Sequence, residues 1–120
     1  MSGTSFVIIS CMKKVYYNKL IRDGIPEVIV RKGGNYETRV LLKKEFEKEL
    51  KKKLIEESKE LAEAPKRELL NELSDVLEII KSIAFYHKIN FKDVEKYQLK
   101  KIKERGGFMK RLFLIWSSGK

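Results

Sequence analysis

Two glutamates in one predicted helix lie on or beside its apolar face, although solvated glutamates normally lie on the opposite face. With Leu54 at zero on a helical wheel, Glu57 lies at about −60° and Glu60 at about −120°. Glu56 lies just beyond them, at about −160°. Glu57 therefore sits in the middle of an apolar stripe, and Glu60 on its edge. The stripe is formed by Leu42, Phe46, Leu50, Leu54 and Leu61.

The next predicted helix repeats the pattern. With Leu73 at zero, Glu72 falls at about −100°, inside an apolar arc, and Asp75 at about −160°, on its border. Each helix thus carries two acidic residues three positions apart, and such residues are neighbours on a helix surface. If the two helices pack antiparallel, the two acidic pairs can meet at their interface.

Carboxylates gathered at a helix interface are very unfavourable unless they are compensated. Basic side chains could pair with them, and Lys53 is the nearest candidate on its helix. Raised pKa values could keep some of them protonated. Alternatively, a divalent cation could bind, and oxygen ligands without His or Cys suit Mg²⁺ or Mn²⁺. The pattern favours the metal, with a salt-bridged cluster as the alternative.

The net charge of the chain indicates which class of substrate the predicted metal site would bind. The chain of 120 residues has a formal net charge of +10. A basic protein attracts polyanions, while Mg²⁺ held by a few carboxylates commonly takes phosphate oxygens as further ligands. An acidic metal pocket in a basic chain therefore indicates phosphorylated substrates.

Long helices must position these residues, and the sequence predicts an all-α fold. Only 2 Pro and 7 Gly interrupt 120 residues. The two central helices are expected to form an antiparallel pair joined by a short turn around residues 62–64, with further helices packed on it. The expected helices are a short one over "IPEVIVRK", one from about Glu37 to Leu61, one from Pro65 to about His87, and one from Asn90 to Gly106.

Short extended segments are expected at both ends of this helical core. "VYYNKLI" is rich in β-forming residues, and "FMKRLFLIW" alternates imperfectly and predicts a short strand. Residues 1–11 are expected to be a non-essential extension, because Met12 opens a reasonable start, and residues 12–120 a single domain. The one cysteine, Cys11, cannot form an internal disulfide, which favours a cytoplasmic protein. No apolar run approaches the roughly 18 residues of a membrane span.

Three stretches together resemble a known family. "EESKE", followed after eleven residues by "ELSD", resembles the EExxE…ExxD signature of the MazG-like all-α nucleoside triphosphate pyrophosphohydrolases. This group includes phosphoribosyl-ATP pyrophosphohydrolases and dimeric dUTPases. "YNKLIRDGIPEVI" is similar to the opening of a MazG-related subgroup, and "KERGGFMKRLFL" to its usual ending. Gly24 departs from the subgroup, in which a Lys is common at that position.

The resemblance implies an activity and roles for the acidic residues. The reaction would be hydrolysis of the α–β phosphate bond of a nucleoside triphosphate, giving a monophosphate and pyrophosphate, with Mg²⁺ as cofactor. Glu57, Glu60, Glu72 and Asp75 would be metal ligands, and Glu56 a further ligand or the group that orients the attacking water. Glu56 and Glu57 are the predicted catalytic pair.

The resemblance also implies an assembly and a place for the phosphates. Family members are usually homodimers or homotetramers, and pairing would complete a four-helix bundle from the two long helices. The basic or polar residues near the two terminal motifs are candidates for substrate binding: Lys19, Arg22, Asp23, Lys103, Arg105 and Arg111.

Three other functions compete with nucleotide-pool house-cleaning. The nearest is phosphoribosyl-ATP pyrophosphohydrolase, against which the "KLIRD" opening counts. A basic helical module that binds nucleic acid without catalysis would show steeply salt-dependent binding. A structural helical dimer would use its carboxylates only to pair with lysines. The sequence favours the nucleotide enzyme, without a membrane or nucleic-acid partner.

Overall fold

The computed structural model describes residues 13–119. Over this range the chain is helical and contains no β-strand, which confirms the predicted all-α class. The chain divides into two compact units, residues 1–49 and residues 50–120. No helix in the described part is both long enough and apolar enough to cross a membrane.

The first unit contains α2 (Ile25–Arg31) and the beginning of α3 (Lys43–Glu63). Pro26 lies in the first turn of α2, where its missing N–H costs no hydrogen bond. After the helix, the backbone N–H groups of Gly33 and Gly34 donate to the carbonyls of Val30 and Ile29, both at 2.9 Å. This short helix agrees with the one predicted over "IPEVIVRK".

Helix α3 begins six residues later than predicted, at Lys43 instead of Glu37. The side chain of Glu45 fixes this start, because it accepts a hydrogen bond from the backbone N–H of Leu42 at 3.3 Å. Arg39 holds the same carboxylate through two hydrogen bonds, of 3.1 and 2.6 Å. The local cap therefore overrides the helix-forming composition of residues 37–42.

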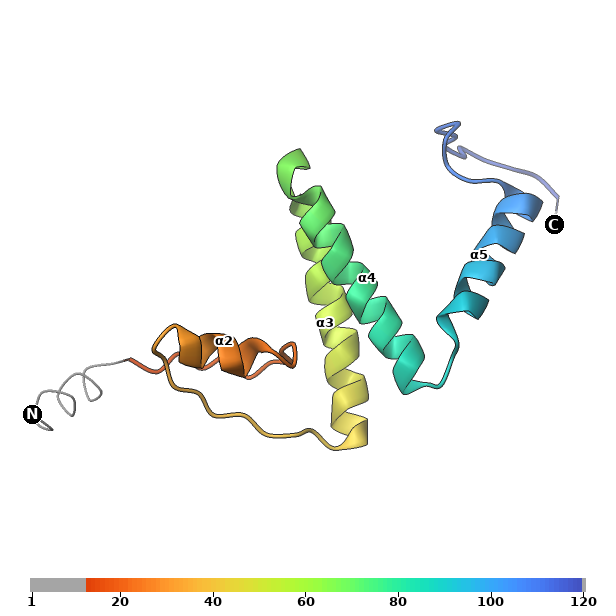
Figure 1. The fold of residues 1–120 in the computed structure, drawn as a ribbon. Helices are drawn as coiled ribbons and strands as arrows, with labels where there is room; N and C mark the ends of the chain where they lie inside the picture. Colours follow the sequence, from red (N-terminus) through yellow and green to blue (C-terminus); the bar gives the residue numbers. More distant parts are fainter. Residues whose placement is uncertain (1–12, 120) are drawn as a thin grey trace, which may run out of the picture. The chain divides into compact units, whose positions relative to one another are not determined.

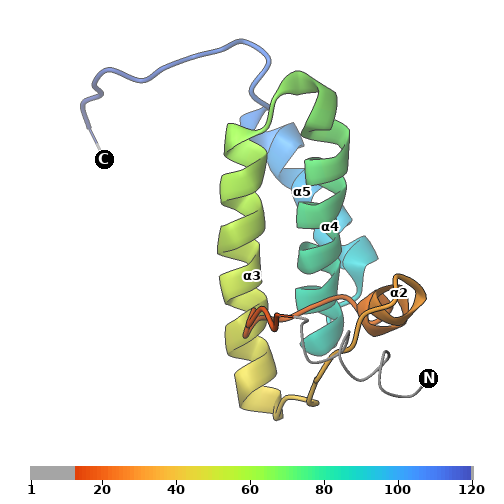
Figure 2. The same cartoon turned by 90° about the vertical axis from the view of Figure 1, so that its left-hand side faces the viewer.

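The second unit contains most of α3, the 3₁₀ turn η1 (Lys66–Glu68), α4 (Leu69–Tyr86) and α5 (Phe91–Arg105). Helices α3 and α4 run antiparallel and side by side, as both views of the ribbon show (Figures 1 and 2). Helix α5 follows α4 and contacts it near their connection, where the Lys81 ammonium group lies 5.2 Å from the ring centre of Phe91. The predicted antiparallel pair with additional helices is thus present.

Local signals set the ends of α4 and α5. Pro65 is extended, with φ −68° and ψ 159°, and precedes η1. Asn90 caps α5 as predicted, because its side chain accepts a hydrogen bond from the backbone N–H of Lys92 at 3.0 Å. Gly106 closes α5 with a φ of 80°, and its N–H donates to the carbonyl of Ile102 at 2.7 Å.

The predicted C-terminal strand is wrong. Residues 108–110 form a bend and a turn, and residues 111–119 have no regular secondary structure. A strand needs a partner whose backbone groups complete its hydrogen bonds, and the described residues supply none. The β-rich stretch "VYYNKLI" likewise lacks strand structure. The expectation for residues 1–11 lies outside the described residues.

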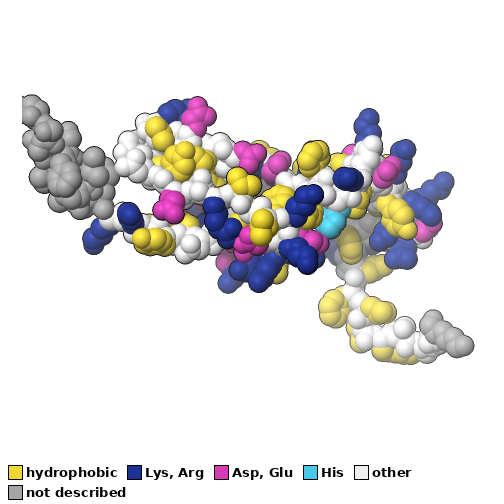
Figure 3. Space-filling model, turned by 90° about the horizontal axis from the view of Figure 1, so that it is seen from below, with side chains coloured by type: hydrophobic (Ala, Val, Ile, Leu, Met, Phe, Trp, Pro, Cys, Tyr) yellow, Lys and Arg dark blue, Asp and Glu magenta, His cyan; other side chains and the backbone are white. Residues whose placement is uncertain are grey.

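The apolar interior of the described chain is small. Leu50 and Ala84 are its buried apolar residues, at 3% and 5% exposure. The apolar arc of α4 is split, because Val76, Ile79 and Ile83 are half-buried while its other half remains exposed. Figure 3 shows hydrophobic side chains at the surface among lysines and arginines. The exposed part of the α4 arc consists of Leu73, Leu77 and Ile80.

Candidate metal centre

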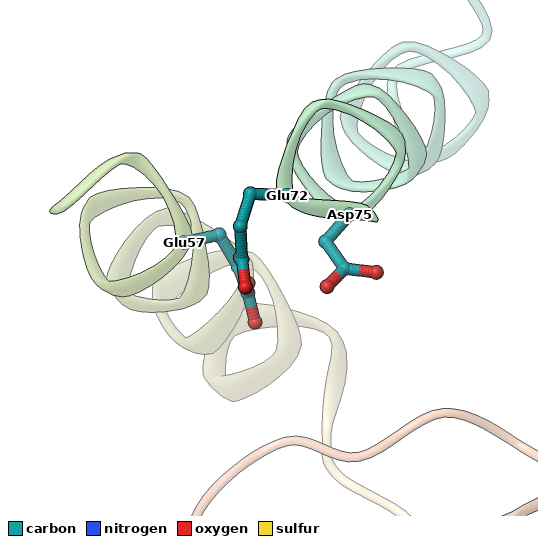
Figure 4. A group of neighbouring side chains, drawn as sticks. All are labelled: Glu57, Glu72 and Asp75. Atoms are coloured by element: carbon teal, nitrogen blue, oxygen red, sulfur yellow. The ribbon is translucent and has the colours of Figure 1, made fainter. Parts of the chain in front are cut away.

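The antiparallel pairing of α3 and α4 brings three predicted carboxylates together. Glu57 lies on α3, and Glu72 and Asp75 lie on α4. Each offers a carboxylate oxygen, and these oxygens all lie within 4.8 Å of one another. Figure 4 shows Glu57 and Glu72 directed into the space between the two helices, with Asp75 beside them. The cluster therefore joins Glu57 to two residues that lie 15 and 18 positions later in the sequence.

Glu57 is the only buried polar or charged residue in the described chain, at 8% exposure. Its Oε2 atom is shielded from solvent and has no hydrogen-bond partner among the described residues, and the Oε2 atom of Glu72 is in the same state. An unpaired oxygen of this kind costs free energy, because its hydration is lost and not replaced. A bound cation or a proton would therefore stabilise these two buried oxygen acceptors.

Lys53 supplies part of the missing positive charge. Its ammonium group lies 3.5 Å from Oε1 of Glu57 and 3.8 Å from Oε1 of Glu56. The Lys53 side chain is 17% exposed. The spacing places Lys53 one helical turn before the two glutamates. The predicted salt-bridged cluster and the predicted acidic metal site thus share residues.

The pKa of Glu57 is raised above its usual value of 4.5. Burial is the largest cause, followed by the negative charge of Glu60 and a hydrogen bond with that side chain. The Asp75 carboxylate adds to the rise, and the Lys53 ammonium opposes it. Glu57 is thus crowded by like charges that one lysine does not fully offset.

The donor set fits a hard divalent cation. Glu57, Glu72 and Asp75 offer oxygen atoms alone, which is the ligand chemistry of Mg²⁺ and Mn²⁺. The two orphaned oxygens would gain the partner that they lack. A cation would also relieve the repulsion that raises the Glu57 pKa. Within residues 13–119, Glu57, Glu72 and Asp75 are therefore the group suited to hold a metal.

The other predicted acidic residues lie around this group. Glu60 is exposed and contacts Glu57, but it does not belong to the set of three that converges. Glu56 is half-buried and lies next to Lys53. Of the four residues predicted as metal ligands, Glu57, Glu72 and Asp75 have carboxylates that converge, whereas Glu60 does not join them.

The predicted substrate-binding residues fall into two groups. Lys19, Arg22 and Asp23 are exposed in the first unit, before α2, where the Lys19 ammonium lies 5.9 Å from the ring centre of Tyr17. Lys103 and Arg105 lie in the last turn of α5. Arg105 and Arg111 line one pocket in the loop after α5, and Lys103 does not line it.

Lys110 lines the same pocket and was not among the predicted substrate-binding residues. Its charge is no signal by itself in so basic a chain. The available signal was position, because Lys110 and Arg111 follow "RGGF" directly, and a glycine pair ends the helix there.

A family model matches the part of the chain that contains these carboxylates. The model that describes the MazG nucleotide pyrophosphohydrolase domain matches residues 46–107. The chain belongs to this MazG family. The match includes all five acidic residues of the predicted signature and Lys53, together with α4 and α5. Neither the curated proteins nor the solved structures gave a significant match.

Membership of the MazG family supports the nucleotide pyrophosphohydrolase class in general. The matched region contains the acidic cluster, whereas Lys19, Arg22, Asp23 and Arg111 lie outside it. The family thus accounts for the α3–α4 pair and its carboxylates.

Proposed function

We propose that this protein is a Mg²⁺-dependent nucleoside triphosphate pyrophosphohydrolase. It adds water across the α–β phosphate bond of the substrate, so that a nucleoside monophosphate and pyrophosphate are released. Its role would be to remove unwanted nucleotides from the pool. The observation that carries the proposal is the buried Glu57 with Glu72 and Asp75, in a region that matches a nucleotide pyrophosphohydrolase family.

Each residue of the site has a distinct task in this proposal. Glu57, Glu72 and Asp75 hold the cation, which when bound supplies positive charge to the phosphate oxygens and makes water more acidic. Glu60 lies at the rim and completes the ligand set. Glu56, half-buried beside Lys53, would orient the attacking water and accept its proton. Mn²⁺ would satisfy the same oxygen ligands.

The test is pyrophosphate release from a panel of nucleoside triphosphates that also includes phosphoribosyl-ATP. The wild type and Glu57→Gln are each assayed with Mg²⁺, with Mn²⁺ and with a chelator. We expect metal-dependent release by the wild type and a loss of at least about 100-fold in Glu57→Gln, since a buried ligand that also carries charge is removed.

Two results would count against the proposal. A flat signal across the whole panel would reject the enzyme, and equal activity of wild type and Glu57→Gln would reject the site. Release from phosphoribosyl-ATP alone would transfer the assignment to that substrate. The matched control is Glu63→Gln, which removes one carboxylate from the exposed end of α3 without touching the cluster.

A further inference from the structure

Lys53 contacts the two glutamates to which the proposed function gives metal binding and proton transfer. Its ammonium group forms ion pairs with Oε1 of Glu57 at 3.5 Å and with Oε1 of Glu56 at 3.8 Å. The side chains of Lys53 and Glu57 are both largely shielded from solvent. Water and salt screen such a pair less than they screen a pair at the surface. Lys53 is therefore part of the surroundings of the candidate metal site.

The two oxygens of the Glu57 carboxylate have different surroundings. Oε1 faces the Lys53 ammonium group. Oε2 is shielded from solvent and has no hydrogen-bond partner among the described residues, like Oε2 of Glu72 on the other helix. Figure 4 shows the Glu57 and Glu72 side chains directed into the same space between α3 and α4. With Oε1 held by the ammonium group, Glu57 presents Oε2 as its unpaired oxygen.

The position of Lys53 on the same helix makes this pairing independent of α4. Lys53 and Glu57 are four residues apart on α3, so their side chains are neighbours on the helix surface. The ammonium group leaves the shielded oxygens of Glu57 and Glu72 without a partner. It therefore lies beside the place that a cation would take, and a cation could bind these oxygens while the ion pair persists.

The number of free carboxylate oxygens matters differently to Mg²⁺ and to Ca²⁺. Ca²⁺ takes about six to eight oxygen ligands in a flexible geometry, and it often binds both oxygens of one carboxylate. Mg²⁺ demands a compact octahedral geometry, keeps several waters and uses only one or two carboxylates. A carboxylate with one oxygen held by an ammonium group loses the second contact that Ca²⁺ commonly uses. Lys53 thus disfavours the larger ion.

We propose that Lys53 is a positioning residue that restricts Glu57 to one ligand oxygen and thereby shifts the selectivity of the site from Ca²⁺ towards Mg²⁺. The inference deepens the proposed function and rests on it for the presence of a divalent cation. Removing a group that orients a metal ligand commonly changes metal affinity about 10–100-fold. Lys53 stands in this relation to Glu57, because its ion pair fixes which oxygen stays free.

A purely electrostatic role of Lys53 is the alternative. A positive charge near the cluster opposes every divalent cation, so its loss would strengthen the binding of Mg²⁺ and Ca²⁺ by the same factor. Loss of the positioning role would instead change the ratio of the two affinities. Lys53→Met/Glu56→Gln separates the two roles, since it removes one positive and one negative charge and frees Oε1 of Glu57 from the ammonium group.

The test measures binding of Mn²⁺ to the full chain by electron paramagnetic resonance, with Mg²⁺ and Ca²⁺ as competitors at fixed ionic strength and without nucleotide. Its readout is the ratio of the Mg²⁺ and Ca²⁺ affinities, which does not depend on turnover. We expect this ratio to shift towards Ca²⁺ by at least about tenfold in Lys53→Met and in Lys53→Met/Glu56→Gln. Lys53→Arg should stay within about threefold of the wild type, because its guanidinium group keeps a charged donor for Oε1.

Lys59→Met is the matched control, because it removes a positive charge from an exposed position of the same helix. Its ratio should equal that of the wild type, and circular dichroism should show that every variant folds. Equal strengthening of Mg²⁺ and Ca²⁺ binding in Lys53→Met, with a wild-type ratio in Lys53→Met/Glu56→Gln, would overturn the proposal. An equally large shift of the ratio in Lys59→Met would overturn it as well.

Failure of this inference is distinguishable from failure of the proposed function. A wild type that binds no Mn²⁺ would reject the metal site and both proposals with it. Metal-dependent pyrophosphate release with an unchanged ratio in the Lys53 variants would leave the enzyme and reject the role of Lys53. A shifted ratio without pyrophosphate release from any nucleotide would leave Lys53 as the positioning residue of a metal site and reject the enzyme.

Discussion

At the scale of single residues, Glu57 dominates the electrostatics of this protein. It is buried beside other carboxylates, and its pKa is raised, first by burial and then by Glu60. Such a residue stabilises the folded chain poorly when it is ionised. Strongly perturbed titratable groups cluster at functional sites. We therefore expect the ionised Glu57 to lower the free energy of unfolding of the metal-free protein, and metal binding to restore it.

The raised pKa of Glu57 predicts the direction of a pH effect. Between the usual value of 4.5 and the higher folded pKa, the folded state binds more protons than the unfolded state. The free energy of unfolding therefore falls as the pH rises through this interval, by about 1.4 kcal/mol for each unit of pKa shift. The free energy of unfolding of the metal-free wild type, measured relative to that of Glu57→Gln, should therefore be larger at mildly acidic pH than at neutral pH.

Urea unfolding of both proteins across this pH range, in EDTA, measures the effect. The difference between wild type and Glu57→Gln isolates the titration of this residue from that of other groups. A difference that does not change with pH, or that changes in the opposite direction, would contradict the raised pKa. Saturating Mg²⁺ should abolish the gain in stability at acidic pH, because the ion favours the ionised carboxylate.

At the scale of elements, α3 carries its own counter-ion. Lys53 lies one turn before Glu57 and is largely shielded from solvent. Loss of one partner from a buried pair commonly destabilises a protein by 3–5 kcal/mol, and less where water reaches the site. Lys53→Met should therefore lower the free energy of unfolding by about 1–3 kcal/mol at neutral pH in the metal-free protein.

Lys59→Met is the matched control, because Lys59 is exposed on the same helix. Chemical denaturation with EDTA and with saturating Mg²⁺ checks the prediction. We expect Mg²⁺ to restore most of the loss in Lys53→Met, since both cations neutralise the same carboxylates. A loss that Mg²⁺ leaves unchanged would show that Lys53 acts through packing alone.

At the scale of the whole molecule, the exposed half of the α4 arc concerns assembly. Leu73 and Leu77 are 54% and 43% exposed. Exposed apolar residues that follow one helix face are typical of an interaction surface. A homo-oligomer in which these residues pack together stays a prediction, and it would supply the remaining helices of a four-helix bundle.

Leu73→Glu/Leu77→Glu tests this prediction through the solution mass. If copies of the chain associate through α4, wild type should elute as an oligomer and the variant as a smaller species with a lower Tm. Light scattering coupled to size-exclusion chromatography gives the mass. Asn71→Glu, at an exposed position on α4, is the control. Equal masses for wild type and variant would exclude an interface through these leucines.

Some features of this molecule follow from local sequence alone. The helix ends at Asn90 and Gly106 were predictable, because a cap is formed by neighbouring residues. The inward direction of Glu57 and Glu72 followed from helical periodicity, which depends only on the 100° turn between residues. The family match to residues 46–107 agrees with the resemblance drawn from the acidic spacing.

Other features needed the tertiary structure. The wheel placed Glu57 in the middle of the apolar stripe and Glu60 on its edge, and both were predicted to bind metal. Only Glu57 converges with Glu72 and Asp75, because the register of α4 against α3 decides which side chains meet. The predicted strand at residues 108–116 failed since strands require a distant partner that composition does not reveal. Local sequence thus determined the helices and the acidic face, and packing between helices decided which carboxylates share a site.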